Sequence, residues 1–142
     1  MFLGGDYHMK KLLLLLIFLS FKSYPADWKY IKGGFIVDTS SIQKLPNGNF
    51  KVWFKNILDP DVLADMLNEH KKIGYYKDYS KYFYSLTLYE INCSQRLLQV
   101  RSGIDYNFDL NIIDSFNITV DNFTPIPPGT AGEMNMKFVC KK

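Results

Sequence analysis

Alternating apolar and polar residues predict the first strands of this chain. Residues 34–38 form a short β-type run, and the hydroxyl side chains of residues 39–41 suit the turn that follows. A Pro-Asn-Gly-Asn turn at 46–49 leads into residues 50–57, where apolar and polar side chains alternate with the period of a half-buried strand. We therefore expect two strands before residue 58.

A helical period replaces this alternation after residue 58. Asp59 suits the N-cap, Pro60 suits the first helical turn, and Gly74 suits the position just past the helix end. His70 lies on the apolar stripe and is interpreted as a packed histidine. The apolar residues that share this face at helical spacing are Val62, Leu63, Met66, Leu67 and Ile73.

The second half of the chain has mainly β-type patterns. Residues 82–92 and 96–101 are two such runs with a short break between them, which predicts adjacent antiparallel strands. One further strand is expected within 105–122, and the prolines of 125–129 predict an irregular loop. The last segment, 134–140, alternates apolar with polar residues and is predicted to be a strand that carries the second cysteine on its apolar face.

The order of these elements predicts an α+β, mainly β fold, in which one α-helix flanks an antiparallel sheet. A chain of 142 residues has room for one domain, and the sequence shows no internal repeat, low-complexity tract or linker. We expect residues 27–142 to form that domain.

Residues 1–26 are interpreted as a secretory signal peptide. A lysine pair at 10–11 precedes an apolar run at 12–19, and residues 20–26 form a polar exit. The apolar run is much shorter than the roughly 20 residues of a membrane-spanning helix, so no stable membrane span is expected.

Both boundaries of this segment have alternatives. Met9 stands directly before the lysine pair and Asp6 suits a basic leader poorly, so translation from Met9 is the second interpretation of the start. Cleavage after Ala26 places a small residue at the cut, and cleavage after Ser23 is the alternative. No cysteine stands directly after the apolar run, where a lipid acceptor would lie. We expect an exported protein without a lipid anchor, periplasmic or secreted, with association with the cell surface left open.

The charge of the chain argues against nucleic acids as partners. Residues 1–26 hold three lysines and one aspartate, so the rest of the chain has 14 basic and 13 acidic residues, a net charge of +1. Because the two signs are interleaved, the basic footprint of a nucleic-acid-binding protein is missing. A modest basic stretch among tyrosines is interpreted either as a solvated helix end and loop or as a ligand patch. The residues of that patch are Lys71, Lys72, Tyr75, Tyr76 and Lys77.

The two cysteines, Cys93 and Cys140, are expected to form a disulfide. An exported chain passes through an oxidising compartment, where a single even pair normally closes. On the chain-entropy model, closing a loop of about 48 residues destabilises the unfolded state by roughly 4 kcal/mol. A metal pair or a reactive thiol is the alternative, and it is less favoured because neither cysteine has a histidine or second cysteine at ligand spacing.

Few residues indicate catalysis. Acid–base and nucleophilic mechanisms need convergent titratable groups. After residue 26 the chain has one histidine and no serine or aspartate in a recognisable nucleophile motif. The carboxylates of Asp38, Glu90 and Glu133 can pair in space, but their spacing does not require it. We expect no enzymatic activity, no cofactor and no metal site.

A series of short motifs runs through nearly all of the chain after residue 26. Its members lie at 28–31, 37–42, 51–53, 84–85, 90–96, 128–133 and 139–140. In this order, with both cysteines in place, the series resembles the surface-adhesin protein E family of Gram-negative bacteria. The residues singled out by the resemblance, which we expect to be mostly structural, are Trp28, Asp38, Trp53, Arg96, Gly129 and Thr130.

The resemblance implies a flattened antiparallel sheet of about six strands with one flanking helix and with the two cysteines joined. The family includes an outer-membrane lipoprotein that binds host vitronectin, laminin and plasminogen. This chain departs from the pattern because it lacks the lipid-accepting cysteine, and because Phe123 stands near the usual position of a tryptophan. The fold is therefore expected to carry over better than the ligand.

Two functions follow from these observations. The first is a non-catalytic, exported, adhesin-like binding module for a host extracellular-matrix or serum protein or for another envelope component. The alternative is a periplasmic structural or assembly factor that acts through exposed strand edges or aromatic patches. A homodimer is compatible with both.

Overall fold

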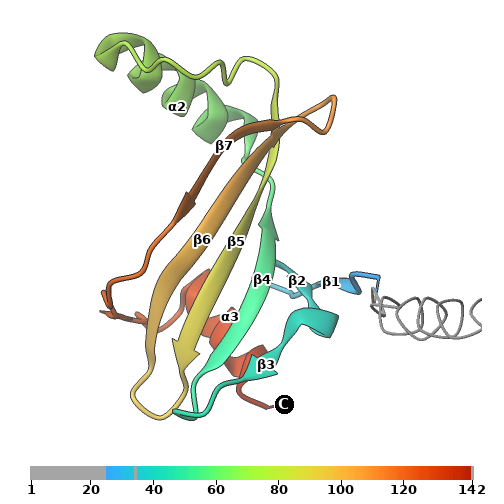
Figure 1. Ribbon diagram of the computed structural model, residues 1–142, viewed down its shortest axis with the longest axis vertical. Helices are drawn as coiled ribbons and strands as arrows, with labels where there is room; N and C mark the ends of the chain where they lie inside the picture. The colour runs from blue at the N-terminus through green and yellow to red at the C-terminus, as the bar shows by residue number, and fades with distance from the viewer. Residues whose placement is uncertain (1–24, 34, 142) are drawn as a thin grey trace, which may run out of the picture.

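The computed structural model describes residues 25–33 and 35–141, and an eight-stranded antiparallel sheet is its main element (Figure 1). The predicted signal peptide lies almost wholly outside the described residues. The strands run in the order β1-β2-β4-β5-β6-β7, with β3 beside β4 and β8 beside β6. Their bounds are β1 (Trp28–Tyr30), β2 (Ile36–Asp38), β3 (Gln43–Lys44), β4 (Phe50–Asn56), β5 (Tyr82–Asn92), β6 (Leu97–Asn107), β7 (Ile112–Asn117) and β8 (Thr124–Pro125).

The predicted α+β, mainly β fold is confirmed. The predicted runs at 50–57 and 82–92 become β4 and β5, and β6 continues past the predicted 96–101 to Asn107. The expected single strand within 105–122 is β7. Because β3 and β8 have two residues each, the sheet has eight strands where about six were expected.

The prediction of a strand at 134–140 was wrong, because this segment lies in α3 (Ala131–Val139). The sheet therefore has two α-helices beside it instead of one. Thr130 is the N-cap of α3, and its hydroxyl oxygen accepts a hydrogen bond from the backbone N–H of Glu133 at 3.3 Å. The buried residues Glu133, Met136 and Val139 repeat at intervals of three, which is the spacing of one helix face.

Helix α3 covers one face of the sheet, which we call the covered face. In Figure 1 this helix lies behind β4, β5 and β6. Between helix and sheet lies the hydrophobic core, and each fully buried aliphatic side chain there contributes roughly 1.5–3 kcal/mol. The core residues are Ile31, Val37, Val52, Phe54, Ile91, Ile126, Met136 and Val139.

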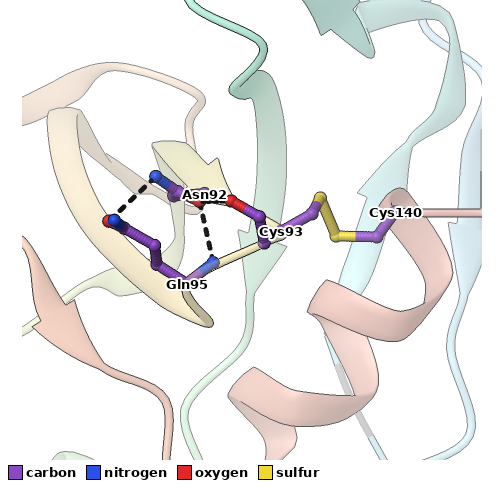
Figure 2. Close-up of a disulfide and its surroundings, with 5 residues drawn as sticks. Asn92, Cys93, Gln95 and Cys140 are labelled. Atoms are coloured by element: carbon purple, nitrogen blue, oxygen red, sulfur yellow. Dashed lines mark hydrogen bonds between the residues drawn. A yellow bond between two sulfur atoms is a disulfide. The ribbon is translucent and has the colours of Figure 1, made fainter.

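The predicted disulfide between Cys93 and Cys140 is confirmed, with a Cα–Cα distance of 5.8 Å (Figure 2). Cys93 follows β5, and Cys140 is the C-cap of α3. In the turn next to Cys93, the side-chain oxygen of Asn92 accepts a hydrogen bond from the backbone N–H of Gln95 at 3.0 Å. The bond therefore fastens a C-terminal helix to the β5–β6 turn, and not a C-terminal strand to the sheet as expected.

The predicted helix is α2 (Pro60–Ile73), which lies at the opposite end of the sheet from α3 (Figure 1). Asp59 caps its N-terminus by accepting a hydrogen bond from the Asp61 N–H at 3.0 Å, and Gly74 ends it with φ at 65°. No residue of α2 is buried. Its apolar stripe therefore does not enter the core.

Candidate binding face

The second face of the sheet carries no helix in the described part of the chain, and we call it the open face (Figure 1). Strand register places Trp53 opposite Leu88, Lys55 opposite Leu86, and Tyr84 opposite Tyr106 on this side. The aromatic, aliphatic and lysine residues of the open face are Trp28, Tyr30, Ile36, Lys51, Trp53, Lys55, Tyr84, Leu86, Leu88, Ile104 and Tyr106, and the register places Asp38, Glu90, Gln99 and Ser102 on the same side.

The centre of the open face is apolar, and polar side chains lie around it. An antiparallel sheet with one covered face usually has polar side chains on the other. Here Leu86, Leu88 and Ile104 lie at the centre of the outward face, and all three are half-buried. An apolar centre on a sheet face without a helix makes this side of the molecule a candidate interaction site.

A lysine is held among aromatic rings on this face. Lys55 Nζ lies 4.6 Å from the ring centre of Trp28 and 4.8 Å from that of Tyr84. The Tyr84 ring in turn stacks on Tyr106 with centres 5.0 Å apart. Cation–π attraction therefore fixes the position of the charged group without neutralising its charge.

A shallow hollow of about 450 Å³ lies on the open face beside the chain that follows β7. Its lining includes Lys51, Leu88 and Arg101. The sheet register shifts between Leu88 and Tyr89, which leaves Arg101 without a partner residue in the β5–β6 ladder. The bulge thus brings the Arg101 side chain to the open face, beside that of Ser102.

Glu90 is paired with Arg101, one of the residues that line this hollow, and its charge is satisfied inside the protein. Its carboxylate accepts hydrogen bonds from Arg101 Nε at 2.7 Å and from Asn49 Nδ2 at 2.8 Å. Burial alone would raise the pKa of Glu90, but these hydrogen bonds outweigh that effect and hold the pKa below its ordinary value. Arg101 also pairs with Asp121 at 2.6 Å, which fixes the loop after β7 against the sheet.

The basic and tyrosine-rich patch predicted from the sequence lies elsewhere, at the C-terminal end of α2 and in the loop after it. The Tyr75 hydroxyl donates a hydrogen bond to Asp114 at 2.6 Å, and Lys77 pairs with the same carboxylate at 3.8 Å. Lys72 pairs with Glu69 at 3.3 Å. Within this patch, Tyr75 and Lys77 hold α2 to β7, while Lys71 and Tyr76 are exposed.

A cluster of rings completes the attachment of α2 to the sheet. His70 lies 4.5 Å from Tyr75 and 4.8 Å from Tyr79, measured between ring centres. The hydroxyl of Tyr79 donates a hydrogen bond to Asp105 at 2.6 Å. The hydrogen bond to Asp114 raises the pKa of Tyr75 to about 12, and burial raises the pKa of Tyr79. The density of tyrosines between residues 75 and 84 was the sequence signal for this cluster.

Three of the residues singled out by the family resemblance meet at the N-terminus of α3. Arg96 Nη2 lies 2.7 Å from Glu133 Oε1, and the Gly129 N–H donates a hydrogen bond to Glu133 Oε2 at 2.8 Å. The ion pair with Arg96, followed by the hydrogen bond from Gly129, lowers the pKa of Glu133 to about 2. Gly129 has φ at 75°, a conformation that suits glycine, and Thr130 is the N-cap.

The other three of these residues lie near the opposite edge of the sheet. Asp38 is the N-cap of a 3-10 helix, η1 (Thr39–Ser41), and it accepts hydrogen bonds from the backbone N–H groups of Asp27 and Ser40. Trp28 and Trp53 lie on the open face. The structure thus separates the six residues into a helix cap, a turn and part of the candidate binding face.

The described ranges 25–33 and 35–141 contain neither a metal-ligand cluster nor a membrane-spanning helix. Among these residues no group of three histidine, cysteine, aspartate or glutamate side chains is placed to hold a metal ion. In the same ranges, no helix has the length and apolar character to span a membrane.

The chain matches a known protein family by sequence and a solved protein structure by fold. A family model described as surface-adhesin protein E matches residues 28–141. A crystal structure of Haemophilus influenzae protein E aligns with a TM-score of 0.54 at 11% sequence identity, and the alignment covers 82% of this chain and 92% of the other. At this identity the likeness demonstrates a shared fold. No curated protein matches the sequence.

Proposed function

Because the chain belongs to the surface-adhesin protein E family, we propose that it is a non-catalytic, exported binding protein of the adhesin type. In this proposal the open face contacts a protein ligand. The single observation that carries it is the apolar centre of the open face, over which no helix of the described chain lies.

The size of the open face suits a protein partner. Six strands about 4.8 Å apart span roughly 24 Å, and the segment from Tyr84 to Glu90 rises roughly 20 Å. This plan area is of the same order as the roughly 800 Å² that each partner contributes to a standard protein interface. Aromatic residues such as Trp53 and Tyr84 are the types enriched at such interfaces.

The titratable groups of the described chain support a non-catalytic role. Buried Glu90 is paired with Arg101, and Glu133 is paired with Arg96. Asp105 accepts hydrogen bonds from Tyr79 and Ser85. Each of these carboxylates is used to hold structural elements together, so none is presented to a substrate as a free general base.

Export is supported by the predicted signal peptide at 1–26 and by the disulfide, a bond that persists in oxidising compartments. We place the protein at the cell surface or in the medium. Protease treatment of intact cells tests this location, since a surface protein is degraded while a periplasmic one survives until the outer membrane is opened. Complete protection in intact cells, with none of the protein in the medium, would favour the periplasmic structural or assembly role.

Ligand binding is tested with purified residues 27–142 and immobilised vitronectin, laminin and plasminogen, beside an envelope extract as the internal candidate. Leu88→Gln changes the centre of the open face, and Leu110→Gln makes the same change in an exposed turn away from it. We expect Leu88→Gln to reduce binding at least about tenfold, which is the usual effect of a central interface residue, and Leu110→Gln to leave it unchanged. Equal binding by both variants would contradict the assignment of the open face.

A further inference from the structure

We propose that the partner of the open face presents an acidic protein surface with an apolar centre, and that Lys51 and Lys55 select it. This inference rests on the proposed function and adds the chemistry of the ligand. Three observations support it: the distribution of charge over the molecule, the state of each charged group on the open face, and the side chains between them.

Charge is separated along the molecule. Residues 59–81 and 105–114, which form the end of the molecule that holds α2, contain eight carboxylates and four lysines. The remaining described residues contain nine basic and five acidic side chains. The half of the sheet that carries most of the open face is therefore the positive half, although the net charge of the whole chain is small.

Two lysines of the open face are available to a partner, whereas Arg101 on the same face is paired with Glu90 and Asp121. Lys55 Nζ lies against the rings of Trp28 and Tyr84. Within the described residues neither Lys55 nor Lys51 forms an ion pair, although Lys51 stands opposite Glu90 in the β4–β5 ladder. Glu90, on the same side of the sheet, is 2% exposed and already paired with Arg101. A carboxylate brought against Lys51 or Lys55 would therefore find an unpaired charge in a partly desolvated setting, where charge complementarity most affects partner choice.

The side chains between the cations favour a protein over a glycan or a lipid surface. Leu86, Leu88 and Ile104 provide no hydrogen-bond donor or acceptor for a sugar hydroxyl. Two lysines attract an anionic bilayer only weakly, and stable membrane association needs a larger basic cluster or a buried anchor. An apolar, aromatic centre beside a few charges is the composition of a protein–protein interface.

The two tryptophans of the chain, Trp28 and Trp53, both lie on the open face, so their fluorescence reports its occupancy directly. The probe is a synthetic amphipathic helical peptide with leucine and glutamate on one face. Versions with glutamine or lysine in place of glutamate, heparin, and vesicles of phosphatidylglycerol are the comparison ligands. We expect the glutamate peptide to shift the emission and bind most tightly, and its affinity to fall as salt rises from about 0.05 M to about 0.5 M.

Charge reversal is the decisive variant. Lys51→Glu combined with Lys55→Glu should weaken binding of the glutamate peptide at least about tenfold and improve binding of the lysine peptide. Lys44→Glu is the matched control, because Lys44 pairs with Phe50 and thus lies on the covered face. Its binding should equal that of the wild type.

Several outcomes would overturn the inference. Equal affinity for the glutamate and glutamine peptides would mean that apolar contact alone drives binding. Tighter binding of heparin or of the vesicles would mean that the face recognises an acidic glycan or a lipid surface. If none of the peptides binds while Leu88→Gln still reduces binding to a host protein, the ligand chemistry is wrong and the proposed function stands.

Discussion

Leu110 has a left-handed backbone, with φ at 62°, in the turn between β6 and β7. Its side chain is 62% exposed, so internal packing does not offset the strain of this conformation. A left-handed residue other than glycine costs about 1–2 kcal/mol, and glycine relieves most of that while losing more chain entropy on folding.

We therefore predict that Leu110→Gly raises the free energy of unfolding by about 0.5–1 kcal/mol. Urea unfolding followed by tryptophan fluorescence measures it. Asp109→Gly is the control in the same turn, since Asp109 has no positive φ and pairs with Lys81 at 3.9 Å. That control should be slightly destabilised, and a gain in both variants would point to general flexibility of the turn.

The ion pair of Glu133 makes the stability of the folded protein depend on pH. Its pKa is lowered from 4.5 to about 2, so its ion pair with Arg96 stabilises the folded protein fully above pH 4.5 and is lost as pH falls toward 2. We predict that Glu133→Gln unfolds more easily at pH 7 and loses less further stability between pH 4.5 and 2 than the wild type. Denaturant unfolding at a series of pH values measures both. Glu69→Gln, which breaks an exposed pair in α2, should retain the wild-type slope.

At the scale of elements, α3 depends on the disulfide for its attachment. The bond closes a sequence separation of 47 residues and holds the last turn of the helix to the β5–β6 turn. We predict that the double variant Cys93→Ser, Cys140→Ser loses roughly 2–5 kcal/mol of stability and that its α3 amides exchange faster. The wild-type protein, denatured without reductant, should show no free thiol. Two free thiols per chain would contradict both the bond and the oxidising compartment.

Helix α2 has a different kind of attachment, because none of its residues is buried. Its His70 ring lies against Tyr75 in the following loop, and the Tyr75 hydroxyl donates a hydrogen bond to Asp114 of β7. We predict that Tyr75→Phe makes α2 and the following loop several-fold more sensitive to limited proteolysis while the melting temperature of the core changes little. Tyr76→Phe is the control, since Tyr76 is 82% exposed.

Alkaline pH should loosen the same attachment in the wild type. The pKa of Tyr75 is raised from 10 to about 12, so the hydrogen bond to Asp114 stabilises the docked helix fully below pH 10 and is lost as pH rises through about 12. Proteolysis of α2 in the wild type should therefore rise over this range. A rise of the same size in Tyr75→Phe would mean that another group controls it.

Local patterns predicted some elements of this fold well and one poorly. The cap residues predicted the bounds of α2 and the alternation predicted β4, because in those segments local propensity and tertiary packing agree. In α3, Met134, Met136 and Phe138 alternate with polar residues, and the strand period that they imitate led to a wrong prediction. The stronger signal was the Thr130-x-x-Glu133 pattern, which is typical of a helix start.

At the scale of the whole molecule, the open face could not be predicted from sequence. Alternation shows that Trp53 and Phe54 point to opposite sides of β4, but it does not show which side a helix covers. That depends on where α3 packs, and α3 had been assigned as a strand. The individual residues of the open face, such as Trp28 and Trp53, were identified, while their common surface was not.

Export determines whether the open face ever meets a partner outside the cell. The lysine pair at 10–11 and the apolar run at 12–19 have the order of a cleavable signal peptide, and small residues precede the expected cut after Ala26 or Ser23. We predict that protein purified from the producing cell begins within a few residues of Asp27 and carries no acyl chains. Intact-mass measurement shows both where the protein begins and whether it carries acyl chains. A protein expressed from codon 27 without export provides the reference mass. A mass that retains Lys10 and Lys11 would place the protein in a reducing compartment. It would then contradict both the export of the protein and its action as a surface binding module.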